Sequence, residues 1–211
     1  VLAEWLTIDT ASQTVTWLSE GGTDAALRDL TRAAPGVKLE LVALLPLSAP
    51  EAAGASALDH ADARARIVSA LASQVAGGAY SGICLYPQQV DAGHLAGLRA
   101  LMRELTAALP SGITSCLVTE AESGLWRDAG LVGAADTVLV QAFREPESGA
   151  PPGPLAPQGW FETFFADATV AVGPEKLRLA LGSFAFMWTD GNPEPVSLPF
   201  AEAMRLILAD P

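Results

Sequence analysis

The fold of this chain is decided by the stretch Tyr80-Ser81-Gly82-Ile83-Cys84-Leu85-Tyr86-Pro87-Gln88 and by the segment Ala92–Leu109 that follows it. The run Tyr80–Tyr86 is mostly apolar, which is typical of a strand that is covered on both faces. In the following segment, apolar residues return at helical spacing on one face, and Pro110 sets its end. The pair predicts one strand and one helix of a parallel α/β fold.

The same alternation of apolar runs and amphipathic segments extends in both directions along the chain. The predicted strands are Leu2–Ile8, Leu39–Pro46, Tyr80–Tyr86, Ile113–Thr119, Thr137–Phe143 and Leu177–Phe184, with a short polar hairpin at Gln13–Leu18. The predicted helices are Asp24–Ala33, Ala61–Val75, Ala92–Leu109, Trp126–Val132, Gln158–Val172 and Phe200–Leu208. Repeated strands and helices in this order indicate parallel β/α units in a single α/β domain.

Parallel β/α units either close into a barrel or form a doubly wound sheet. A glycine-rich phosphate loop would favour the doubly wound sheet, but Gly21-Gly22 and Gly77-Gly78 lack the G-x-G-x-x-G spacing. We therefore predict a (β/α)8 TIM-barrel type fold. A full barrel typically needs about 250 residues, and this chain has 211. We expect an incomplete barrel, with residues 1–211 forming one domain excised from a longer protein.

The acidic balance of the chain excludes one class of partner. Lys and Arg number 12 against 24 Asp and Glu, which gives a formal net charge of −12. Such a surface repels phosphate backbones, so we expect no nucleic-acid partner. The sequence contains no apolar run long enough to span a bilayer, so we expect no membrane insertion by this segment. Uncharged glycans and small molecules remain open as ligands.

The chain offers little for metal or redox chemistry. Cys84 and Cys116 lie in apolar, strand-like runs, and we expect two buried free thiols in preference to a disulfide. The two histidines, His60 and His94, lie in helix-like polar surroundings. Because no His, Cys and carboxylate residues cluster at metal-ligand spacing, we predict no metal and no cofactor.

Three segments together resemble glycoside hydrolase family 18, and in particular the chitinase-like modules of bacterial multidomain polysaccharide-processing proteins. They are Tyr80–Gln88, Ala135–Arg144 and Pro174–Trp188. The first resembles the family strand aromatic-Asp-Gly-Ile/Val-Asp-hydrophobic-Asp-aromatic-Glu, and the second resembles the strand that ends in Met-Ala/Thr-Tyr-Asp. The third resembles Pro-x-Lys-Leu…Gly-x-x-x-Tyr-Gly-Tyr-Asp-Trp. The resemblance covers most of the chain and implies a barrel whose site lies at the carboxyl ends of its strands.

The resemblance also implies where catalytic residues would lie, and each of these positions has lost its acid or its hydroxyl. The general acid falls on Gln88, the further acids of that strand on Tyr86, Cys84 and Ser81, and the later Tyr and Asp on Phe143 and Arg144. A glutamine amide cannot release a proton near neutral pH, and losing a positioned general acid typically costs about 10²–10⁴ in rate. We therefore expect no catalytic residue and a degenerate, non-enzymatic module.

We expect this degenerate module to bind an N-acetylhexosamine polysaccharide, either chitin-like or peptidoglycan-like. Trp188 lies at a strand end that matches the pocket tryptophan of the family, whereas Trp160 lies in an apolar segment and is expected in the core. The expected binding residues are Glu4, Tyr86, Gln88, Glu120, Gln141, Arg144 and Trp188. Other domains of the parent protein would be further partners, and we expect an extracytoplasmic location, periplasmic or at the cell surface.

Two alternatives remain open. The acids at or just after the predicted strand ends are Glu4, Glu120, Glu122 and Glu145. Two of them would suffice for an active glycosidase with relocated carboxylates. A purely structural scaffold module would instead have a filled barrel mouth with no pocket near Gln88. The Pro- and Gly-rich stretch Arg144–Pro157 is expected to form an ordered rim loop on the functional face.

Overall fold

The computed structural model describes residues 2–18, 29, 32–34, 36–47, 57–76, 80–146, 148–189 and 194–209. Its strands are β1 (Leu2–Asp9), β2 (Thr14–Trp17), β3 (Glu40–Pro46), β4 (Gly82–Gln88), β5 (Thr114–Glu120), β6 (Thr137–Gln141), β7 (Leu177–Ala180), β8 (Phe184–Met187) and β9 (Val196–Pro199). Its α-helices are α2 (Ala61–Ala76), α3 (Leu95–Ala108), α4 (Ala129–Ala134), α5 (Gln158–Val172) and α6 (Phe200–Ala209). Two 3₁₀ turns are η1 (Ala57–Asp59) and η2 (Leu125–Arg127).

The main sheet has seven strands in the order β2-β1-β3-β4-β5-β6-β7. β2 pairs antiparallel with β1, and every other pairing in this sheet is parallel. Within the described ranges no strand joins β2 to β7, so the sheet does not close into a full barrel. The predicted α/β architecture of TIM-barrel type, in an incomplete form, is therefore confirmed.

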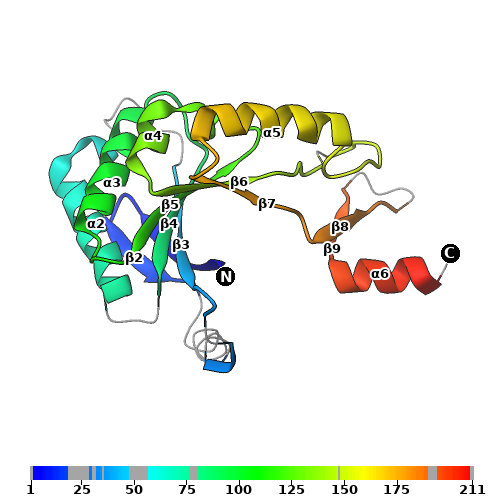
Figure 1. Ribbon diagram of the computed structural model, residues 1–211, viewed down its shortest axis with the longest axis horizontal. Coiled ribbons are helices and arrows are strands. Elements are labelled where there is room, and N and C mark those ends of the chain that lie inside the picture. The colour runs from blue at the N-terminus through cyan, green and yellow to red at the C-terminus, as the bar shows by residue number, and fades with distance from the viewer. Residues whose placement is uncertain are drawn as a thin grey trace.

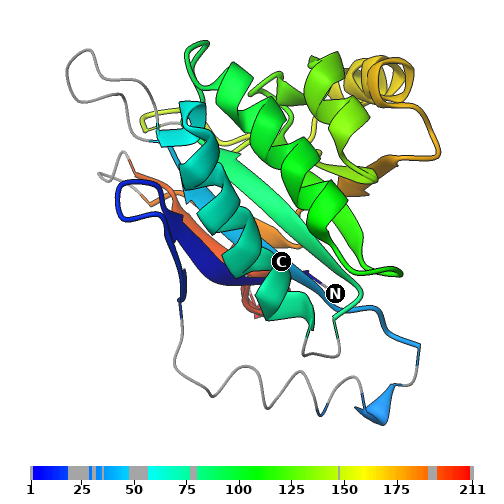
Figure 2. The ribbon, with the colours of Figure 1, turned by 90° about the vertical axis from the view of Figure 1, so that its left-hand side faces the viewer.

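Helices α2, α3, α4 and α5 cover one face of the sheet (Figures 1 and 2). The main core lies between this helix layer and the strands. Ile83 and Leu85 of β4 share one buried cluster with Leu98 and Leu101 of α3, and all four side chains are fully buried. Burying such a side chain contributes about 1.5–3 kcal/mol relative to leaving it in water. The strand–helix pair that was predicted from Tyr80 onward is thus the centre of the core.

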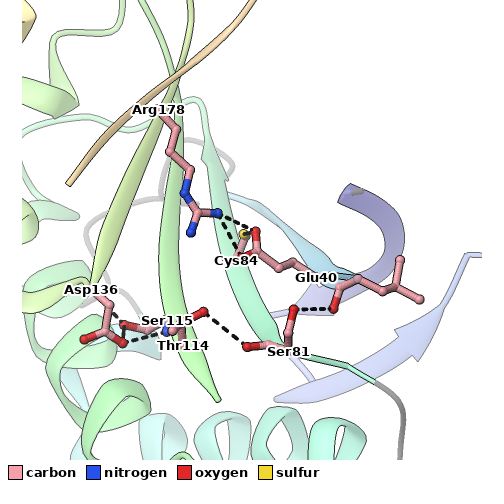
Figure 3. A network of polar contacts seen from close by, with 8 residues as sticks. Glu40, Ser81, Cys84, Thr114, Ser115, Asp136 and Arg178 are labelled. Atoms are coloured by element: carbon pink, nitrogen blue, oxygen red, sulfur yellow. Dashed lines mark hydrogen bonds and ion pairs between the residues drawn. The ribbon is translucent and has the colours of Figure 1, made fainter. Parts of the chain in front are cut away.

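The opposite face of the sheet carries a second, smaller cluster from the alternate strand positions. It contains Val42, Cys84, Tyr86, Cys116, Val118 and Leu139. Arg178 of β7 reaches across this face to Glu40 of β3, with Nη1 2.8 Å from Oε2 (Figure 3). In a flat sheet, four strand spacings would separate β3 from β7 by roughly 19 Å. The ion pair therefore shows that the sheet curls around this inner face, as the wall of a barrel does.

The predicted strand Leu177–Phe184 is wrong in its second half. β7 ends at Ala180, whose carbonyl accepts a hydrogen bond from the backbone N–H of Ala142 at 2.8 Å. The next residue, Leu181, is 68% exposed. Phe184–Met187 instead forms β8, which pairs antiparallel with β9 outside the main sheet. The predicted strand therefore consists of parts of two strands in separate sheets, with a short break between Ala180 and Phe184.

The predicted helix Ala92–Leu109 begins later than expected, at Leu95. The carboxylate of Asp91 accepts hydrogen bonds from the backbone N–H groups of Gly93 and His94, at 2.8 and 3.1 Å, and folds the preceding residues into a turn. His94, expected in helix-like polar surroundings, is buried at the start of the helix. The residue is 4% exposed, and its Nδ1 lies 3.0 Å from the Asp91 carboxylate.

The predicted helix Trp126–Val132 is interrupted. The 3₁₀ turn η2 comes first, and α4 begins after Asp128, whose side chain accepts from the backbone N–H groups of Gly130 and Leu131. Such an N-cap competes with a continuous helix because it holds its own residue in extended backbone. The predicted strand Thr137–Phe143 stops at Gln141, and the predicted helix Asp24–Ala33 lies largely outside the described residues.

The hairpin of β8 and β9 and the helix α6 extend away from the helix layer (Figure 1). Only Ala203 of α6 is buried, whereas Phe200, Ile207 and Leu208 are exposed. None of the described helices is both long and apolar enough to span a bilayer. Both cysteines are buried free thiols, as predicted.

Candidate functional site

A cavity of about 380 Å³ opens at the carboxyl ends of β4, β5 and β6. Its lining consists of Tyr86, Gln88, Glu120, Glu122, Gln141, Phe143, Arg144 and Glu145. The carboxyl ends of parallel strands meet at one edge of a sheet, and functional sites of barrels form there. The position that the sequence predicted for the site is therefore the position of a real cavity.

Tyr86 forms the floor of this cavity. Its side chain belongs to the inner-face cluster, and the residue is 8% exposed. The hydroxyl donates to Oε1 of Glu120 at 3.0 Å, and the side-chain amide of Gln141 lies 3.4 Å away. A phenol carries one proton, so Gln141 completes the contact best with its NH₂ group turned toward the phenol oxygen. Burial and the hydrogen bond to Glu120 raise the pKa of Tyr86 to about 12, so the hydroxyl remains a donor at neutral pH.

Gln88 lies at the end of β4, one alternate position beyond Tyr86. Its carbonyl accepts from the backbone N–H of Leu47 at 3.0 Å, which ties the strand end to the chain beyond β3. The next residue, Gln89, has a positive φ of 56°. This left-handed backbone turns the chain sharply away from the strand. The Gln88 side chain is half-buried and stays at the cavity wall.

Arg144 is the cation of the cavity, and it is already paired. Its Nε lies 2.8 Å from Oε1 of Glu122. Its guanidinium carbon lies 5.0 Å from the ring centre of Trp160, within the range of a cation–π contact. Its backbone N–H donates to the carbonyl of Leu155 at 2.8 Å. These contacts fix both the side chain and the start of the loop that follows β6.

A second cavity of about 350 Å³ lies beside the first, between the loop and Trp188. The two cavities share Glu122, Arg144 and Glu145 in their linings. Trp188 donates from Nε1 to the carbonyl of Ala150 at 2.9 Å, which anchors the middle of the loop. The described residues of the predicted rim loop thus make defined contacts and line the second cavity.

The structure brings most of the expected binding residues together. Those that line the two cavities are Tyr86, Gln88, Glu120, Gln141, Arg144 and Trp188. Glu4 is different: its backbone lies within β1, level with Val42, which is itself level with Cys84. The expectation that Glu4 lies at a strand end is therefore wrong, and its side chain lies outside the described part of the molecule.

Ser81 and Cys84 lie away from the cavity, since Ser81 directly precedes β4 and Cys84 lies within it. The Ser81 hydroxyl donates to the carbonyl of Leu39 at 3.1 Å, at the amino end of the strand (Figure 3). Cys84 is fully buried beside Glu40, with Sγ 4.0 Å from Oε2. The neighbouring Cys116 thiol and burial raise the pKa of Cys84. Both positions now have structural surroundings and take no part in lining the cavity.

The sequence prediction missed the ion pair between Glu40 and Arg178. Glu40 is 5% exposed and is held by both carboxylate oxygens, 2.8 and 2.9 Å from Nη1 of Arg178. The sequence did contain a signal for this pair, since Glu40 and Arg178 are each a charged residue in an otherwise apolar strand. Pro146 and Leu155, which line the second cavity, lie within the predicted rim loop Arg144–Pro157.

The other tryptophans have different roles. Trp126 is buried and donates from Nε1 to the carbonyl of Ala121 at 2.8 Å. Trp160 stacks on Phe164 with ring centres 5.3 Å apart and packs against the main core, as predicted. Trp188 is therefore the tryptophan that the described cavities expose to a ligand.

The cavities offer carboxylates, amides, one phenol and one indole face. Among the described residues no group of three or more His, Cys, Asp and Glu side chains could hold a metal ion. Amides and carboxylates at the wall of a cavity suit a ligand rich in hydroxyl and amino groups.

Comparison with known proteins identifies the fold. No model of a protein family matches the chain, and no curated protein matches it. Among solved structures, a chitinase from Chromobacterium violaceum superposes with a TM-score of 0.80 at 18% identity, over 99% of this chain and 68% of that one. The spore cortex-lytic enzyme SleL from Bacillus cereus gives 0.76 at 16% identity, over 97% of this chain and 49% of that one. A class V chitinase from Pseudomonas fluorescens gives 0.76 at 16% identity, over 97% and 66%. The predicted resemblance is confirmed at the level of the fold: this chain has a chitinase-like α/β fold of TIM-barrel type, with an open sheet.

Proposed function

We propose that this chain is a degenerate chitinase-like module that binds an N-acetylhexosamine polysaccharide, chitin-like or peptidoglycan-like, without cleaving it. The observation that carries the proposal is the cavity at the carboxyl ends of β4, β5 and β6, with the Gln88 amide at its wall. The resemblance to chitinases assigns the general acid to this position, and an amide cannot supply the proton.

The size and the lining of the cavities support binding. A volume of about 380 Å³ lies within the range of sites that hold small ligands. The second cavity shares three lining residues with the first and extends the surface open to a glycan chain toward Trp188. Solved structures with the same fold are named as chitinases and as a spore cortex-lytic enzyme, whose substrates are polysaccharides by name. An extracytoplasmic location and neighbouring domains in the parent protein belong to the same proposal.

Titration calorimetry with chitin tetramer and with peptidoglycan fragments tests the proposal. We expect binding, and we expect Gln88→Ala and Trp188→Ala each to weaken it about tenfold, or about 1.4 kcal/mol. Phe165→Ala is the matched control, because Phe165 is an exposed aromatic residue on α5, outside both cavities. Absence of binding at millimolar ligand, or equal losses in the control, would contradict the proposal.

A second candidate function is hydrolysis by relocated carboxylates. One observation favours it: Glu120, Glu122 and Glu145 all line the first cavity. A panel of fluorogenic aryl glycosides separates the two candidates. Turnover that is abolished by Glu120→Gln or Glu145→Gln would establish an enzyme and would exclude the binding module. The third possibility, a scaffold with a filled barrel mouth, is disfavoured because Gln88 borders an open cavity.

A further inference from the structure

We propose that, within such a polysaccharide, this site prefers amino-sugar units with a free ammonium group, so that its ligand is a partly de-N-acetylated polymer. This inference rests on the proposed carbohydrate-binding function and narrows its substrate class. It is carried by the balance of charges in the first cavity and by the geometry of Glu120 within it.

The first cavity holds more carboxylates than cations. Glu120, Glu122 and Glu145 line it together with a single cation, Arg144. Arg144 is bound to Glu122 at 2.8 Å and lies over the Trp160 ring, so its charge is already compensated. In the described part of the chain no cationic side chain pairs with Glu120 or Glu145. The cavity therefore presents two uncompensated negative charges to a ligand.

Glu120 is the carboxylate whose position is best fixed. Its Oε1 accepts a hydrogen bond from the Tyr86 hydroxyl at 3.0 Å, and Tyr86 is packed into the inner face of the sheet. The phenol cannot neutralise the carboxylate by giving up its proton near neutral pH, because its pKa is about 12. No hydrogen bond from a described residue reaches the second oxygen, Oε2, which remains available to a ligand.

An ammonium group suits the acceptors that surround Glu120. It carries three protons and needs three acceptors. Glu120 supplies a carboxylate oxygen, and Gln88 and Gln141 supply side-chain amide oxygens in the same cavity. Hydrogen bonds between an ammonium and a carboxylate are about twice as strong as neutral ones. An N-acetyl group is neutral, offers one N–H and brings a methyl group to a mostly polar wall, so it gains less here.

Calorimetric titration of the purified chain at mildly acidic pH tests the preference. The ligands are glucosamine tetramer, N-acetylglucosamine tetramer and tetralysine, which matches the charge of the first without its sugar rings. We expect the glucosamine tetramer to bind about fivefold more tightly than the acetylated one, the size expected of a partly exposed ion pair. We expect Glu120→Gln, which keeps the shape, to remove this difference. Glu162→Gln, on the exposed face of α5, should leave it unchanged.

Each outcome separates this inference from the function on which it rests. Equal affinities for the two sugar tetramers, or tighter binding of the acetylated one, would overturn the ammonium preference and leave carbohydrate binding intact. Tetralysine that binds as tightly as glucosamine tetramer, with no effect of Glu120→Gln, would assign the preference to the general acidity of the chain and would also overturn it. If neither sugar tetramer binds, both proposals fail.

Discussion

The hydroxyl of Tyr86 lies between the carboxylate of Glu120 and the amide of Gln141, at the floor of the cavity. We expect it to titrate at about pH 12, well above the value of about 10 for a free tyrosine. The ultraviolet difference spectrum between the protein and Tyr86→Phe isolates this phenol, because the other tyrosine, Tyr80, is present in both. A midpoint near 10 would show that the hydroxyl is neither buried nor bound to Glu120.

The raised pKa has a consequence for stability. A group whose pKa is higher in the folded state holds its proton more tightly there. Its contribution to the free energy of unfolding is complete below about pH 10 and is lost as the pH rises toward about 12. Alkaline unfolding should therefore depend less on pH in Tyr86→Phe than in the protein itself.

The ion pair between Glu40 and Arg178 contributes to stability by an amount that depends on its burial. Arg178→Met leaves the Glu40 carboxylate buried without its cation. Because the Arg178 side chain is 40% exposed, we expect a loss of about 2 kcal/mol, below the 3–5 kcal/mol of a fully buried pair.

Urea unfolding of a double-mutant cycle measures this interaction. The double variant Glu40→Leu/Arg178→Met removes both charges together and should recover most of the stability that Arg178→Met loses. A double variant as unstable as the single one would show that packing, and not charge, holds β3 and β7 together.

The positions of residues at strand ends were predictable from the sequence. The partners of charged residues inside strands were not. Tyr86, Gln88, Glu120 and Gln141 could be placed because the carboxyl ends of parallel strands meet at one edge. The partner of Arg178 could not, since it depends on how far the sheet curls, and no local pattern states that curvature.

At the scale of the elements, α3 and η1 approach each other closely at Gly97. A Cβ added there would lie 2.7 Å from both Cβ and the carbonyl oxygen of Leu58. We expect Gly97→Ala to lower the free energy of unfolding by about 1–3 kcal/mol, because the backbone of η1 must shift. Gly133 of α4 is the matched control, with nothing within 4 Å of an added Cβ. Gly133→Ala should stabilise by about 0.5–1 kcal/mol.

Thermal unfolding of the two alanine variants checks this contact. Equal melting temperatures for Gly97→Ala and Gly133→Ala would mean that α3 does not pack on η1 as described.

The closeness of Gly97 to Leu58 was not predictable, because it joins segments far apart in the sequence. The helices themselves were, since their apolar spacing is local. The break between β7 and β8 was missed, although Gly182-Ser183 is a turn signal at that place, because apolar residues lie on both sides of the pair.

On the scale of the whole molecule, the chain has a chitinase-like frame, in which we propose a degenerate site. The frame was predictable from the alternation of strands and helices and from three matching segments. The incomplete barrel was predicted from about six recognisable β/α units and from the length, since a full barrel typically needs about 250 residues. The sequence could not show whether the site is an open cavity or is filled, because that depends on side chains from β4, β5 and β6 and from the loop after β6. The structure shows two adjoining cavities there.

The central claim, binding without cleavage, is tested most directly by following one glycan through the complex. Chitin and glucosamine tetramers are incubated with the protein, the complex is isolated, and mass spectrometry measures the length of the bound and released sugars over time. The account predicts that the tetramers are retained at full length. It also predicts that Gln88→Glu alone produces no shorter sugars, since the resemblance assigns the other family acids to Ser81, Cys84, Tyr86 and Arg144, which are not acids. Shorter sugars that disappear in Glu120→Gln, or no retained sugar at all, would contradict it.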